Sequence, residues 1–177
     1  MRITSISRLA VVAALAAAAL TGCATAAGDP QTPVATASDS ITIQDAWAKS
    51  ADSGMSAAFG VLVNDGDADV TVVSASSSAS TMIELHETVE NDSGEMVMRE
   101  VEGGFVIPAG GTFPLEPGGN HIMFMDVTEP LVAGAEVEIT FTFDDGSTFT
   151  FTAPVKDYSG ANENYEGDMD MDMEGDH

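Results

Sequence analysis

The chain has 177 residues, a formal net charge of −24 and a single cysteine. Such acidity disfavours binding to nucleic acid and to anionic membrane surfaces and attracts cations, although it also serves solubility. One cysteine excludes an intramolecular disulfide, a Cys-x-x-Cys redox pair and a Cys-rich zinc site. Because no cysteine follows Cys23, a blue-copper centre, which needs a thiolate, is excluded as well.

Residues 1–22 have the features of an export signal. Two arginines precede an apolar run, Leu9 to Leu20, that is too short to span a bilayer. The run ends in Leu-Thr-Gly-Cys23, which resembles the lipobox of bacterial lipoproteins. We therefore expect lipidation at Cys23 and an exported protein, held by its lipid at the outer face of the cytoplasmic membrane or in the periplasm. The alternative is an ordinary signal peptide, cleaved near residues 24–27, that leaves an incidental cysteine.

A flexible tether is predicted for residues 23–40, which contain almost no large apolar side chain. From Ile41 the pattern changes to short alternating runs separated by Gly, Asn, Asp and Pro. Asn64-Asp65-Gly66-Asp67 has the composition of a turn and lacks the ligand order of a calcium loop. The runs predict strands at 41–49, 57–63, 70–75, 82–89 and 95–101.

A β-hairpin is predicted near the end of this region. Apolar residues alternate with polar ones over 137–143 and again over 149–155, on either side of the turn at 144–147. No segment of 41–156 sustains a helical period. We predict one all-β domain over 41–156, an antiparallel β-sandwich or barrel.

The segment 157–177 is predicted to be a disordered tail rich in Met and Asp, because it cannot bury enough apolar surface to fold alone. The tail is nevertheless a candidate copper-gathering arm, for Cu(I) or Cu(II). Its candidate ligands are Met169, Met171, Met173 and His177.

Histidine and methionine gather between Glu84 and Asp126. In a strand, alternate residues share one face, so Glu84 and His86 would lie opposite Ile83 and Leu85. By the same parity, His121, Met123 and Met125 share a face, as do Met96 and Met98. Imidazole nitrogen with thioether sulfur suits Cu(I), whereas two nitrogens without thiolate suit zinc poorly. The competing interpretation is that these methionines only fill the core.

This region resembles the periplasmic copper chaperones of the PCuAC type, whose motif is a His, a Met and then His-x-Met. The resemblance covers roughly 41–155 and implies a cupredoxin-like Greek-key β-sandwich that holds Cu(I) near its surface. The residues that carry it are Asp45-Ala46-Trp47, Ala57-Ala58-Phe59, Glu84-Leu85-His86, Met96-Val97-Met98-Arg99, Val101-Glu102-Gly103-Gly104, Ile107-Pro108-Ala109-Gly110-Gly111 and Pro117-Gly118-Gly119-Asn120-His121-Ile122-Met123.

By this resemblance the copper ligands would be His86, Met98, His121 and Met123. Eleven residues lie between His86 and Met98 and twenty-two lie between Met98 and His121, one more in each gap than the family motif has. Met96 and Met125 are therefore kept as reserve ligands. Arg99 is expected to be structural, paired with an acidic neighbour.

The resemblance implies a chaperone that donates Cu(I) to an envelope acceptor such as the binuclear copper site of cytochrome c oxidase. A copper storage or detoxification protein would use the same ligands without a dedicated acceptor. An interaction β-sandwich without a metal is the third possibility. No catalytic motif is present, so an enzyme is the least favoured class.

Overall fold

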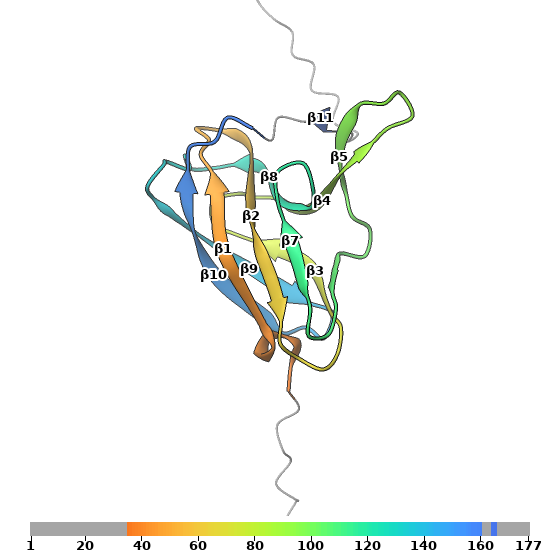
Figure 1. Ribbon diagram of the computed structural model, residues 1–177. Helices are drawn as coiled ribbons and strands as arrows, with labels where there is room; N and C mark the ends of the chain where they lie inside the picture. The colour runs from red at the N-terminus through yellow and green to blue at the C-terminus, as the bar shows by residue number, and fades with distance from the viewer. Residues whose placement is uncertain (1–34, 161–163, 166–177) are drawn as a thin grey trace, which may run out of the picture. The chain divides into compact units, whose positions relative to one another are not determined.

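The computed structural model describes residues 35–160 and 164–165 of the chain (Figure 1). The expected signal peptide, Cys23, most of the expected tether and the tail ligands Met169, Met171, Met173 and His177 lie outside these residues. Within the described part, no helix is long and apolar enough to cross a membrane.

The described residues contain eleven strands and one short 3-10 helix, so the predicted all-β class is confirmed. The elements are η1 (Ala37–Asp39), β1 (Ile41–Lys49), β2 (Gly54–Asn64), β3 (Val70–Ser76), β4 (Ile83–Glu90), β5 (Met96–Glu100), β6 (Phe105–Ile107), β7 (Thr112–Leu115), β8 (His121–Val127), β9 (Glu136–Phe143), β10 (Thr148–Lys156) and β11 (Asn164–Tyr165).

The strands form a sandwich because one continuous sheet folds over on itself. Their order is β11-β5-β4-β8-β2-β1-β10-β9-β3-β6, with β7 paired to β2. In Figure 1, β9 lies behind β1 and β2, and the end of β10 stands beside β1. Most pairs are antiparallel as predicted, but β1 pairs with β10 and β5 with β11 in parallel. Such pairs join distant parts of the chain, which alternation within a strand does not predict.

Alternating apolar residues build the core between the two layers. The hairpin β9–β10 is paired as predicted, with Phe151 opposite Ile139 and Phe149 opposite Phe141. Leu85, Ile122 and Phe124 enter the same core from β4 and β8. The residues that alternate with them on β4 and β8 therefore face away from this core.

Ordered structure extends past the predicted domain limits of 41–156 at both ends. At the N-terminal side, within the expected tether, Ala37 N–H donates to Asp145 at 2.7 Å and Ser38 N–H donates to Ser147 at 3.1 Å. At the C-terminal side, Lys49 Nζ donates to the carbonyl of Gly160 at 2.7 Å. The predicted tail thus begins with residues that contact the sandwich.

A β-bulge in β1 changes the face on which Trp47 lies. The register between β1 and β2 shifts between Gln44 and Trp47, and Asp45 adopts a left-handed φ of 52°. Aspartate tolerates this conformation better than most residues. Before the bulge, Ile43 packs against the main core, whereas after it Trp47 packs with Phe59 in a second cluster on the outer face. The bulge therefore supplies an aromatic side chain to that face.

Candidate metal centre

Two histidines lie side by side on neighbouring strands. His86 on β4 is the register partner of His121 on β8. Their ring centroids are 5.5 Å apart, with the ring planes at 71°. Both side chains lie on the outer face of the sheet, yet His86 is 0% exposed and His121 is 3% exposed. Thirty-five positions separate the two residues in the chain, and strand pairing alone brings them together.

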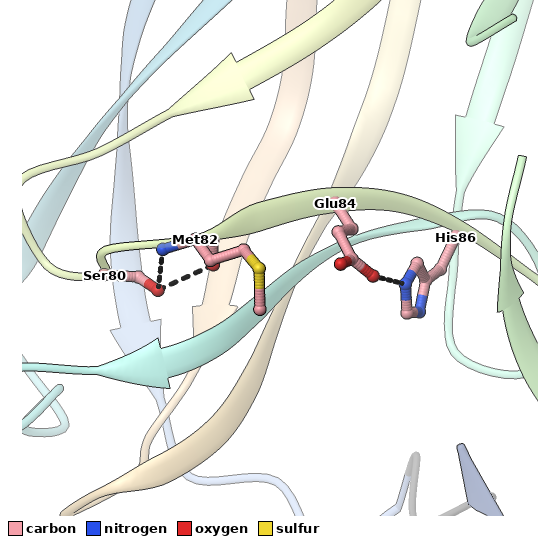
Figure 2. Close-up of polar contacts among 4 residues, drawn as sticks. All are labelled: Ser80, Met82, Glu84 and His86. Atoms are coloured by element: carbon pink, nitrogen blue, oxygen red, sulfur yellow. Dashed lines mark hydrogen bonds and ion pairs between the residues drawn. The ribbon is translucent and has the colours of Figure 1, made fainter. Parts of the chain in front are cut away.

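Hydrogen bonds engage one nitrogen of each ring. Nε2 of His86 lies 2.7 Å from Oε2 of Glu84 (Figure 2), and Nδ1 of His121 lies 3.0 Å from the carbonyl oxygen of Gly119. Since a carbonyl can only accept, His121 carries its proton on Nδ1 in this arrangement. The opposite nitrogens, Nδ1 of His86 and Nε2 of His121, are also buried. These are the nitrogens that a metal ion would use.

Met98 and Met123 lie next to the histidine pair along the strands. Met123 follows His121 by two residues and pairs with Glu84, which precedes His86 by two. Met98 on β5 pairs with Thr88, two residues beyond His86. Met98 and Met123 are 6% and 4% exposed and belong to one buried cluster. We call this the outer cluster; its buried members are Ala57, Phe59, Met98, Met123 and Met125, with Trp47 packed against it.

The reserve ligands differ in their surroundings. Met125 belongs to the outer cluster and is 6% exposed. Met96 pairs with Glu90 at the other end of β5 and is 47% exposed. The structure therefore gathers His86, Met98, His121, Met123 and Met125 on one face and leaves Met96 outside the cluster.

Aromatic rings form a wall on one side of the histidines. Phe59 lies 6.2 Å from the His121 ring and 4.6 Å from Trp47, measured between centroids. Tyr158 lies 5.3 Å from Trp47, and Nζ of Lys156 is 5.7 Å from the Trp47 ring. This wall limits access of water to the buried imidazoles from that side.

Sequence reasoning did not assign roles to the hydrogen-bond partners of the histidines. Glu84 could have been identified, because it shares strand parity with His86 at a spacing of two. The carbonyl of Gly119 could not, because no side chain marks it. Arg99 pairs with an acidic neighbour as expected: its guanidinium contacts Glu87 at 2.8 Å.

If the outer face holds a metal ion, the ligands of that ion must include sulfur. Within the described residues, no group of three or more His, Cys, Asp or Glu side chains is placed to bind a metal ion. Two imidazoles with thioethers form a soft donor set, suited to Cu(I) rather than to calcium or magnesium. The surrounding apolar and aromatic residues also fit an ion of low charge.

The fold and this cluster define a class: a β-sandwich protein with a buried histidine–methionine cluster on the outer face of one sheet. Solved structures have the same fold. The copper-bound PCuAC domain from PmoF2 matches with a TM-score of 0.57 and 18% identity, over 70% of this chain and 97% of that domain. The CuI-DR1885 solution structure from Deinococcus radiodurans matches with a TM-score of 0.53 and 29% identity, over 69% of this chain and 83% of that one.

The chain belongs to the family described as "Putative lipoprotein LpqE-like", which matches residues 41–155. It is also similar to "Putative lipoprotein Lxx21020" of Leifsonia xyli subsp. xyli, with 48% identity over 165 residues, 93% of this chain and 98% of the relative. The family match spans the sandwich domain that carries the outer cluster.

Proposed function

We propose that this protein is an extracytoplasmic copper chaperone that binds Cu(I) through His86, Met98, His121 and Met123. The observation that carries the proposal is the buried cross-strand pair of His86 and His121, with a thioether of the same cluster on either side along the strands. The likeness to PCuAC copper-binding domains supports the copper assignment.

The chemistry of these ligands suits transfer rather than permanent storage. Thioethers are neutral and remain reduced under conditions in which thiols would be oxidised, and they bind Cu(I) as soft donors. A site with two imidazoles and two thioethers carries no charge of its own, so an acceptor that offers a thiolate binds Cu(I) more strongly. Transfer then proceeds by stepwise exchange of ligands, without a change in the oxidation state of copper.

Titration with Cu(I) tests the site. We expect one tight equivalent in the sandwich domain, measured by competition with a Cu(I) chelator of known affinity. His86→Ala and His121→Ala should each abolish this equivalent while the domain keeps its β-rich circular dichroism. Unchanged binding in both folded variants would contradict the proposal, and complete absence of Cu(I) binding would favour an interaction module.

We also propose lipid attachment through Cys23, as the lipoprotein descriptions of the family and of the Leifsonia relative support. The predicted acceptor is an envelope copper protein, with the binuclear copper site of cytochrome c oxidase as the first to test. Transfer of Cu(I) to an apo fragment of that oxidase would support a chaperone. Absence of transfer at matched affinities would favour storage or detoxification.

A further inference from the structure

Met55, Met82 and Met125 lie on, or directly before, the three neighbouring strands β2, β4 and β8, at one end of the outer cluster. Met82 directly precedes β4, and its carbonyl accepts the N–H of Met125 on β8 at 3.0 Å. Met55 lies on β2 where its register with β8 shifts, between the pair of Gly54 with Val127 and the pair of Ser56 with Phe124. Because neighbouring strands are about 4.8 Å apart, long side chains that rise from one face of three such strands can converge.

All three belong to the outer face by alternation. Met125 follows Met123 by two residues and is part of the outer cluster. Met55 precedes Ala57, another cluster member, by two residues. Figure 2 shows Met82 on the same side of β4 as Glu84 and His86.

The backbone of Met82 is held in place. The hydroxyl of Ser80 donates to the carbonyl of Met82 at 2.8 Å and accepts the N–H of Met82 at 3.3 Å (Figure 2). The same hydroxyl accepts the N–H of Asp126, the residue after Met125, at 3.3 Å. Ser80 thereby ties the start of β4 to β8 at the position of the two methionines.

Exposure falls along this set toward the candidate centre. Met55 is 52% exposed and Met82 is 36% exposed, whereas Met125 is 6% and Met123 is 4% exposed. The exposed pair gains little from packing, so the usual reason for methionine in a core does not apply to it. The proposed ligands are almost fully buried, so copper needs a path to them from solvent.

We propose that Met55, Met82 and Met125 form a second, weaker Cu(I) site through which copper enters and leaves the buried centre. This inference rests on the proposed function. Three thioethers without imidazole should bind Cu(I) less tightly than the centre that contains two imidazoles. An ion bound there can pass to the main site while Met125 holds it. The thioether of Met123 then replaces another thioether of the second site, and copper remains Cu(I) throughout. The carboxylate of Asp126, the residue after Met125, favours a cation at this end of the sheet.

Methyl resonances of methionine test the second site directly. In the full exported chain labelled at the methionine methyl groups, the first equivalent of Cu(I) should shift the methyl resonances of Met98 and Met123. A further equivalent should shift the resonances of Met55, Met82 and Met125 and leave that of Met96 unchanged. Failure of the first step would contradict the proposed function. Success of the first step with no shift of Met55, Met82 and Met125 would overturn only the second site.

A double variant tests the role in transfer. Met55→Leu with Met82→Leu keeps side-chain volume, so the fold should be retained. We expect unchanged affinity for the first equivalent of Cu(I). Release of Cu(I) to a chelator should be slower by about tenfold, which corresponds to a barrier raised by about 1.4 kcal/mol. Met96→Leu, which removes an exposed thioether elsewhere, is the matched control. Equal release rates in the double variant and the wild type would overturn the proposal.

Discussion

Glu84 orients the buried ring of His86. A carboxylate that accepts a ring N–H fixes the tautomer of a ligating histidine and increases the basicity of the other nitrogen. The 2.7 Å contact between Glu84 Oε2 and His86 Nε2 has this geometry. Glu84 therefore acts through His86, as a positioning residue for the proposed copper site.

Replacing Glu84 should weaken copper binding without removing it. We expect Glu84→Ala to lower Cu(I) affinity by about 10–100-fold, the usual effect of losing such a partner. Glu84→Gln should lose less, because its amide oxygen still accepts the N–H of His86. Chelator competition measures both variants. Equal affinities for the wild type and Glu84→Ala would exclude the orienting role.

The two methionines of β5 should differ sharply in their effects. Met98 is buried in the outer cluster, whereas Met96 is 47% exposed. We expect Met98→Leu to lower Cu(I) affinity by at least about tenfold, equivalent to 1.4 kcal/mol, and Met96→Leu to leave it unchanged. Isothermal titration or chelator competition with the two leucine variants shows which methionine is the copper ligand. The reverse order of effects would make Met96 the ligand.

At the scale of elements, alternation predicted most strands but not their partners. Val137 to Phe143 and Phe149 to Val155 alternate so regularly that the hairpin was predicted within a residue at each end. The strands β6 and β7 were missed because they have three and four residues and lie among prolines and glycines. The β1 bulge was missed because Asp45 gives no distinctive signal in an alternating run.

The same limits apply to the candidate site. Parity placed His86, His121 and Met123 on the outer faces of their strands, and the structure has them there. The adjacency of His86 and His121 depends on the β4–β8 register, which links residues far apart in the chain. The choice between Met98 and Met96 depends on how β5 is aligned with β4, which places Met98 opposite Thr88 and Met96 opposite Glu90. The spacing of residues in the sequence does not determine this alignment.

Gly104 is required where the chain enters β6. It has a φ of 86°, and a Cβ built on it would overlap the carbonyl oxygen of Val72 on β3. Gly103 has a similar φ of 85° but open space around it. Gly103→Ala should therefore cost about 1–2 kcal/mol from the backbone conformation alone. Gly104→Ala should cost clearly more, and urea unfolding of the two variants measures the difference. Equal stabilities would refute the close approach to β3.

The attachment of η1 should depend on pH. The N–H of Ala37 donates to Asp145 and holds the pKa of that carboxyl below its ordinary value, helped by hydrogen bonds from Ser147. A lowered pKa means that the contact is fully present above the ordinary carboxyl pKa. It is lost as pH falls through the lowered value.

Hydrogen exchange at the Ala37 amide measures this attachment. Protection should persist at neutral pH and disappear in acid. Asp145→Asn should weaken the pH dependence, because an amide does not titrate, and leave only the part due to Asp39, whose carboxylate accepts from Thr36 with a lowered pKa. Protection of Ala37 that is unchanged through strongly acidic pH would contradict the assigned role of Asp145.

At the scale of the whole molecule, two deletions separate the two roles expected of the segment after β10. One role is to cover the aromatic wall, and the other is to gather copper. Trp47 is the single tryptophan of the chain and contacts Tyr158. Deleting residues 157–177 should shift Trp47 fluorescence to longer wavelength, whereas deleting 166–177 should not. If the shorter deletion also leaves copper stoichiometry and transfer rate unchanged, the tail is not a copper-gathering arm.

X-ray absorption spectroscopy of the Cu(I)-loaded protein tests the central claim most directly. A chain that starts after Cys23 and ends at residue 165 lacks both the cysteine and the tail methionines, so that any sulfur detected comes from the sandwich. We predict a first shell with both imidazole nitrogen and thioether sulfur, and loss of sulfur scattering in the Met98→Leu, Met123→Leu double variant. A shell that contains only nitrogen and oxygen, or sulfur scattering unchanged in that variant, would contradict the proposed site.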